Sequence, residues 1–139
     1  MCNEPVSLYF EVPPVAKQRA RVARGRAYTP KKTSDFEANI KRLAMHQWNR
    51  PVLLGPVKAS IYFILPRPKS RKTGVWVSVR PDLDNYIKSV LDALNGITWE
   101  DDAQVCMLHA EKQYADSMTS PRIVVMVSSL TTPRMATPS

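Results

Sequence analysis

Short apolar runs along the chain predict four β-strands. The strongest candidate is residues 56–66, which are rich in β-branched and aromatic residues and have proline at both ends. Residues 7–12, 104–112 and 121–127 are shorter runs of the same kind. The last two are separated by a polar loop, so we expect them to form an antiparallel hairpin.

Two other segments have the period of an amphipathic helix. The first begins at Ser34, which with Glu37 forms a predicted capping box, and ends near residue 50. Its apolar stripe consists of Phe36, Ile40, Leu43, Ala44 and Trp48. The second follows Asp82 and ends at Gly96. Its apolar stripe consists of Leu83, Tyr86, Ile87, Val90, Leu91 and Leu94.

The resulting order of elements predicts an α+β fold with a small mixed or antiparallel sheet of about four strands. Two main helices are expected to pack on this sheet. We expect one domain over residues 1–128 and a disordered Ser/Thr/Pro-rich tail over 129–139. Residues 15–32 and 67–80 have neither period, and both are expected to be long basic loops.

The distribution of charge points to a polyanionic partner. The chain of 139 residues carries a net charge of +8, and its two predicted loops contain no acidic residue. Such clustering is typical of nucleic-acid-binding proteins, although a merely solvated surface is the alternative. The residues expected to contact DNA are Lys17, Arg19, Arg21, Arg24, Arg26, Lys31, Arg67, Lys69, Arg71 and Lys72.

Other classes of protein receive no support from the sequence. No apolar run approaches the roughly 18 residues of a membrane span, and no secretory signal is visible. Cys2 and Cys106 are far apart and have no metal-ligand spacing, which indicates free thiols and a cytoplasmic location.

Six of the twelve acidic residues lie between residues 82 and 102. Carboxylates in such a cluster are the hard ligands that Mg²⁺ prefers, and Mg²⁺ activates water for attack on phosphorus. A structural explanation is also open: Asp82 as a helix cap and Asp84–Lys88 as an i,i+4 pair. Asp101 and Asp102 follow the far end of the helix, roughly 18 Å away. To share a metal ion with Asp82 and Asp84, the chain must double back or a partner subunit must contribute.

The same residues carry a resemblance to a known family. Residues 80–88 (RPDLDNYIK), 92–96 (DALNG) and 99–105 (WEDDAQV) resemble the core motifs of RusA-type Holliday junction resolvases, which occur in bacteria and prophages. Residues 17–21 and 25–30 resemble the basic N-terminal motif of many members. Ala20, where many members have proline, and the long 67–79 loop are departures from the family pattern.

The resemblance implies a homodimeric hydrolase that cuts four-way DNA junctions symmetrically with Mg²⁺, or Mn²⁺ as a substitute. It implies metal binding and catalysis by Asp82, Asp84 and Asp102, an essential role for Lys88, and a lesser metal role for Asp101. No membrane and no small-molecule cofactor are expected. A non-catalytic basic nucleic-acid-binding protein and a broader flap or branched-DNA nuclease remain the alternatives.

Overall fold

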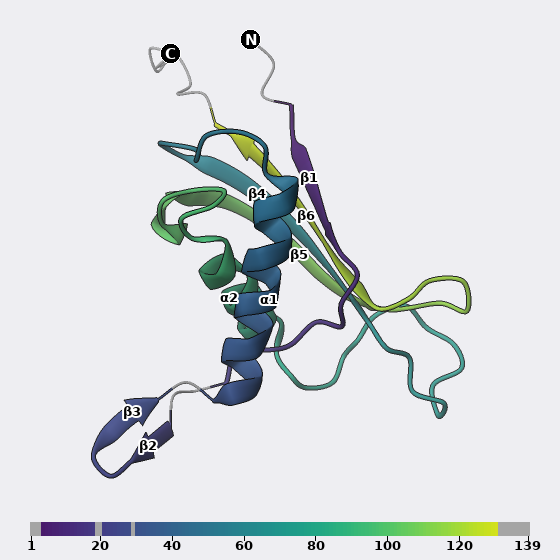
Figure 1. Ribbon diagram of the computed structural model, residues 1–139. Helices are drawn as coiled ribbons and strands as arrows, with labels where there is room; N and C mark the ends of the chain where they lie inside the picture. The colour runs from purple at the N-terminus through teal and green to yellow at the C-terminus, as the bar shows by residue number, and fades with distance from the viewer. Residues whose placement is uncertain (1–3, 19–20, 29, 131–139) are drawn as a thin grey trace, which may run out of the picture.

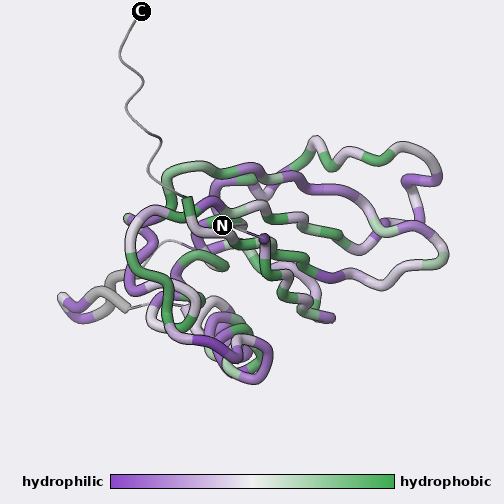
Figure 2. Tube along the Cα trace, turned by 90° about the horizontal axis from the view of Figure 1, so that it is seen from above, coloured by the Kyte–Doolittle hydropathy of each residue, from purple (hydrophilic) through white to green (hydrophobic). Residues whose placement is uncertain are grey.

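The protein is a four-stranded mixed sheet with two helices on one face (Figures 1 and 2). The computed structural model describes residues 4–18, 21–28 and 30–130, with the backbone only for 21–23, 27 and 28. The sheet has the order β1-β6-β4-β5. Its strands are β1 (Val6–Phe10), β4 (Val57–Leu65), β5 (Val105–Tyr114) and β6 (Arg122–Ser129). The helices are α1 (Lys31–Gln47) and α2 (Leu83–Leu94). The predicted α+β class is confirmed.

The core lies between the sheet and the two helices. In β4 every second residue from Val57 to Phe63 is buried, as expected of a strand with one face against helices. Strand β6 alternates in the same way. From the helices, Ile40 and Ala44 of α1 and Val90 and Leu94 of α2 are fully or almost fully buried against this surface. The predicted helical stripes therefore face the core.

The predicted hairpin between the last two strands is wrong. Strands β5 and β6 do not pair; both flank β4, β5 parallel to it and β6 antiparallel. A parallel neighbour requires a crossover connection, and α2 supplies it between β4 and β5. The alternation of apolar and polar residues predicts that a segment forms a strand, but it does not determine which strands lie next to it.

The predicted start of the first helix is also wrong. Helix α1 begins at Lys31, with Pro30 as the N-cap. The hydroxyl of Ser34 donates to the carbonyl of Lys31, one turn inside the helix, and so caps nothing.

The first basic segment contains a hairpin where only a loop was expected. Strands β2 (Arg21–Ala23) and β3 (Arg26–Tyr28) pair antiparallel, and the hairpin projects away from the sheet (Figure 1). Arg24 and Gly25 form its turn with φ values of 52° and 77°. Two consecutive residues with positive φ are typical of the type I′ turn that fits the twist of a two-stranded hairpin.

The C-terminal boundary differs slightly from expectation. Strand β6 continues to Ser129, one residue into the predicted tail, and residues 131–139 of that tail lie outside the described residues. Within the described ranges, no helix is both long enough and apolar enough to span a membrane.

Trp99 is the largest fully buried side chain, and its indole nitrogen donates to Asn95 at 2.8 Å. Trp99→Ala removes this ring and leaves a cavity beneath the turn that follows α2. We expect the free energy of unfolding to fall by about 3–5 kcal/mol in urea denaturation. Met45→Ala, at a side chain with 64% exposure, is the control and should change it by less than about 0.5 kcal/mol.

Candidate active site

Asp82 and Asp84 lie at the N-terminal end of α2. Asp82 occupies the N-cap position, but its side chain makes no capping hydrogen bond, and Asp84 lies in the first turn. Both are exposed. Among the described residues, no side chain pairs with either carboxylate. The capping explanation for Asp82 is therefore not supported, and both carboxylates are accessible to a ligand.

The segment before Asp82 is fixed by strand β5. The amine of Lys112 donates to the carbonyls of Val79 and Pro81, at 2.7 Å in each case. An open pocket of about 430 Å³ beside this segment is lined by Arg80, Pro81, Asp82 and Asn85. An acidic and a basic side chain thus border one depression at the start of α2.

Lys88 does not pair with Asp84 as the i,i+4 spacing suggested. Its amine lies 3.7 Å from Asp92, one turn further along α2, and its side chain is 61% exposed. An exposed pair of this kind is weak, so the amine is free to exchange partners.

Asp101 and Asp102 have different environments. Asp101 is the N-cap of a short 3-10 helix, η1 (Asp102–Gln104), and its carboxylate accepts from the backbone N–H of Ala103 at 3.1 Å. The side chain of Gln104 completes the capping box. Asp102 has no such bond within the described chain and is half-buried. The carboxylate of Asp101 thus stabilises the start of η1, whereas the carboxylate of Asp102 forms no such bond among the described residues.

The structure does not bring Asp102 to Asp82 and Asp84 within one chain. The chain reverses direction after α2, so β5 runs antiparallel to the helix. Asp102, just before β5, therefore lies at the C-terminal end of α2, whereas Asp82 lies at its N-terminal end. From Lys112, which contacts Pro81, to Val105 is seven positions, or about 23 Å along a strand. Within the described residues, no group of three or more His, Cys, Asp or Glu side chains is arranged to hold a metal ion.

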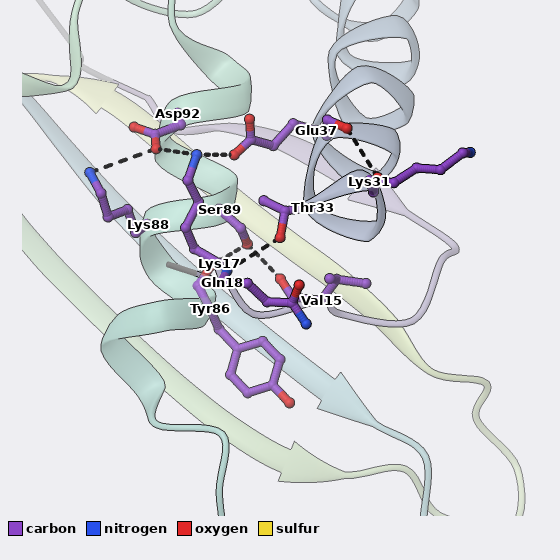
Figure 3. A network of polar contacts seen from close by, with 11 residues as sticks. Val15, Lys17, Gln18, Lys31, Thr33, Glu37, Tyr86, Lys88, Ser89 and Asp92 are labelled. Carbon is purple, nitrogen blue, oxygen red and sulfur yellow. Dashed lines mark hydrogen bonds and ion pairs between the residues drawn. The ribbon is translucent and has the colours of Figure 1, made fainter. Parts of the chain in front are cut away.

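Lys17 belongs to an internal ion-pair network (Figure 3). Its amine donates to Glu37 of α1 and lies 3.1 Å from Asp92 of α2, and its side chain is 22% exposed. Burial disfavours the charged amine, but the hydrogen bonds to Glu37 and Asp92 outweigh this, so the pKa of Lys17 is raised. The contact of Lys17 with DNA stays a prediction; in the structure it joins two helices.

Backbone contacts beside Lys17 fasten the same segment. The N–H of Lys17 donates to the carbonyl of Asn85 at 2.8 Å, and the hydroxyl of Ser89 donates to Val15 at 2.7 Å. The N–H of Gln18 donates to Thr33. Because this segment leads into the basic hairpin, the base of the hairpin is tied to the helix that carries Asp84 and Lys88.

The remaining basic residues fall into two groups. The guanidinium of Arg67 donates to the carbonyls of Ala115, Arg71 and Gly74, so Arg67 holds its own loop together. The guanidinium of Arg71 stacks over Tyr114 at 5.6 Å. Arg71 is nevertheless exposed, as are Arg24, Arg26, Lys31, Lys69 and Lys72. Arg19 lies outside the described residues, and only the backbone of Arg21 is described.

Sequence reasoning missed three residues around the site. Asp92 holds both Lys17 and Lys88, Arg80 borders the pocket, and Lys112 positions the chain before Asp82. The i,i+4 spacing of Lys88 and Asp92 was a sequence signal for the contact between these two residues. The contacts of Lys112 join positions more than thirty residues apart and leave no local signal.

Comparison with known proteins identifies the family. Residues 11–128 match the family described as endodeoxyribonuclease RusA. The chain belongs to the RusA family. This membership indicates endodeoxyribonuclease activity. The chain is also 31% identical over 129 residues to the uncharacterized protein YqaN of Bacillus subtilis (strain 168), covering 82% of this chain and 89% of YqaN.

The Lys17 network predicts a marked loss of stability in Lys17→Met. This change removes the cation that lies between the carboxylates of Glu37 and Asp92 and leaves Asp92 with the more distant amine of Lys88. We expect the free energy of unfolding to fall by about 1–3 kcal/mol in urea denaturation. Lys31→Met is the matched control, because Lys31 forms an exposed pair with Asp35 and should change stability by less than about 0.5 kcal/mol. Equal effects of the two substitutions would contradict the internal role of Lys17.

The same network predicts a pH dependence. Since the pKa of Lys17 in the folded protein is above its ordinary value of 10.5, its stabilisation is complete below that value. It is lost as the pH rises through the folded-state pKa. The stability difference between wild type and Lys17→Met should therefore be constant from about pH 8 to 10 and shrink at higher pH. A difference that stays unchanged through strongly alkaline pH would contradict this assignment.

Proposed function

We propose that this protein is a Mg²⁺-dependent endodeoxyribonuclease that resolves four-way DNA junctions. The observation that carries the proposal is the pair of exposed, unengaged carboxylates of Asp82 and Asp84 at the start of α2, in a basic chain of the RusA family. Asp102 is proposed as the third acid of the site and Asp101 as a lesser contributor, because its carboxylate already caps η1.

The donor set fits a hard divalent cation. Mg²⁺ is usually held by one or two carboxylates, together with substrate phosphate and several waters. Asp82 and Asp84 offer such oxygens on an exposed surface beside an open pocket. When bound there, Mg²⁺ would supply activation of water and stabilisation of the leaving oxygen, and Mn²⁺ could replace it.

Lys88 is proposed to stabilise the charge that develops on the scissile phosphate. It lies one turn after Asp84 on α2, and its amine lies 3.7 Å from Asp92, one turn further along the helix. Because Lys17 also binds Asp92, the carboxylate is already partly neutralised, which weakens its hold on Lys88. The amine can therefore leave Asp92 for a phosphate oxygen, where a preorganised cation is most effective.

The exposed basic residues are proposed to hold the DNA backbone. The hairpin carries Arg24 in its turn and Arg26 at the start of β3, both exposed, and the 67–80 loop carries Lys69 and Lys72. Arg19, Arg21 and Lys31 are proposed to extend the first of these surfaces. Contacts of this kind bind phosphates without reading bases, so binding should weaken steeply as salt is raised.

A homodimer is proposed because a four-way junction presents two symmetry-related scissile phosphates. One chain supplies the residues of one acid cluster, and a two-fold assembly supplies the second. A cytoplasmic location is proposed from the absence of disulfide spacing in the sequence.

Two substitutions test the chemistry. Asp84→Asn and Asp102→Asn should each reduce Mg²⁺-dependent cleavage of a four-way junction by at least about a hundredfold. Junction binding, measured by mobility shift without metal, should be retained or tighter because a negative charge near phosphates is removed. Asp35→Asn, at an exposed acid on α1, is the control and should cleave like wild type.

Three outcomes would contradict the proposal. Loss of binding together with cleavage would mean that the carboxylates maintain the fold or the DNA surface. Absence of cleavage by wild type at every Mg²⁺ and Mn²⁺ concentration would favour a non-catalytic binding protein. Equal cleavage of flaps and four-way junctions by wild type would indicate the broader branched-DNA nuclease.

A further inference from the structure

One of the three tryptophans lies on the surface of the basic loop that follows β4. Trp76 is 62% exposed, whereas Trp48 is 7% exposed and Trp99 is fully buried. The indole N–H groups of the two buried rings donate to the carbonyl of Pro51 and the side chain of Asn95, respectively. The ring of Trp76 has no such bond among the described residues and contributes little to the core.

The backbone on both sides of Trp76 is ordered by strand β5. The N–H of Val77 donates to the carbonyl of Lys112 at 3.3 Å. The N–H of Tyr114 donates to the carbonyl of Val75 at 2.8 Å. These two bonds fix the chain on either side of Trp76, so the exposed ring is presented from a defined backbone.

Trp76 lies on the face of the sheet that carries no helices. It is opposite Gln113 in an antiparallel bridge, and residues opposite each other share a face. Gln113 follows Lys112, whose register partner in β4 is Phe63, and Phe63 is fully buried in the core beneath the helices. Successive residues of a strand point to opposite faces, which places Gln113 and Trp76 on the helix-free face. Val77, the next residue, points the other way and is 5% exposed.

The surroundings of Trp76 in the chain are cationic. The 67–80 loop contains five basic residues and no acidic one. The exposed basic residues of this loop are Lys69, Arg71, Lys72 and Arg80. Glu111, on the same face of the sheet as Trp76, has both carboxylate oxygens engaged by its neighbours in β5. An exposed aromatic ring in a cationic loop without acids is the combination with which proteins bind the bases of unpaired nucleic acid.

We propose that Trp76 stacks on a base of branched DNA and gives the protein a preference for branch points over continuous duplex. In a continuous duplex both faces of each base pair are covered by neighbouring pairs, so a protein ring can stack only where the duplex is first unstacked. At a branch point the stack is already interrupted, and a base is displaced more easily. The inference rests on the proposed function, because it takes branched DNA as the substrate.

The position of Trp76 in the chain places the stacked base near the bond that is cut. Trp76 lies six positions before Asp82, and six residues span at most about 20 Å. Lys112 binds the carbonyls of Val79 and Pro81 and so fastens the chain between them to β5. Since the phosphates of one strand advance by about 3.4 Å per nucleotide, the stacked base should lie within about six nucleotides of the cleaved bond.

Tryptophan fluorescence tests the stacking without reference to activity. Because Trp48 and Trp99 are buried, Trp76 is the tryptophan whose emission DNA can quench by contact. Emission should fall when a four-way junction is added without metal, fall less with linear duplex, and stay unchanged in Trp76→Phe. No change with the junction, an equal fall with both DNAs, or an equal fall in Trp76→Phe would overturn the proposal.

Substitutions of Trp76 test the selectivity. Trp76→Ala should weaken junction binding by about 5- to 150-fold, the range expected for one base–aromatic stack, and should change duplex binding by less than about twofold. Trp76→Phe should keep most of the junction affinity, whereas Trp76→Leu, which is apolar but has no ring, should bind like Trp76→Ala. Equal losses on both DNAs, or wild-type affinity of Trp76→Leu, would overturn the stacking.

A matched control lies in the same loop. Val75 is 50% exposed and has no ring, so Val75→Ala should bind the junction like wild type. All four variants should keep the wild-type midpoint in urea denaturation, because both side chains lie outside the core. A lowered midpoint in both Trp76→Ala and Trp76→Leu would assign their loss of binding to the fold and overturn the proposal.

Failure of the stacking and failure of the nuclease function give different results. Quenching of Trp76 by the junction, with no cleavage at any Mg²⁺ or Mn²⁺ concentration, would reject the nuclease function and keep the stacking. Cleavage of four-way junctions by Trp76→Ala with wild-type efficiency and selectivity would keep the nuclease function and reject the stacking.

Discussion

Helix α2 and strand β5 lie side by side and run in opposite directions. This arrangement follows from the crossover that joins two parallel strands, because the helix must carry the chain back before β5 can run with β4. It places Asp82 and Asp84 at one end of the sheet and Asp102 at the other. The separation of the acidic residues along the sheet depends on this one constraint.

A second constraint is the partly buried Lys17 amine, which lies between two carboxylates. The amine joins α1 to α2, and the flanking backbone bonds tie the start of the basic hairpin to α2. A partly desolvated charge of this kind is stabilised by its hydrogen-bonded partners. The segment that leads into the hairpin is therefore held against α2, the helix that carries Asp84 and Lys88.

The sequence predicted the helices and strands that have a local hydrophobic period. All four strands of the sheet and both helices lie close to the expected residues, because alternation and a 3.6-residue period follow directly from one-sided burial. It did not predict the neighbours of β5, since pairing is a choice among distant segments. The β2–β3 hairpin was not predicted, because Arg24–Gly25 is not one of the usual turn pairs and the flanking strands have three residues each and carry no period of their own.

For the site, the sequence and the family resemblance nominated the acidic residues, and the structure shows how they are placed. It separates Asp101, which caps η1, from Asp102, which has no bond of this kind among the described residues. Ion pairs such as Lys17–Asp92 join distant positions, so no spacing rule reveals them. Likewise, a sequence motif does not show whether three acids share one cation, because the motif does not give their distances in space.

The most direct measurement is paramagnetic broadening of backbone amide signals by Mn²⁺ in the junction-bound protein. If one ion is held by all three acids, the signals next to Asp82, Asp84 and Asp102 should broaden together at the lowest Mn²⁺ concentrations. Excess Mg²⁺ should reverse the effect. Broadening next to Asp82 and Asp84 with the Asp102 signal unchanged, or no selective broadening at all, would contradict the account.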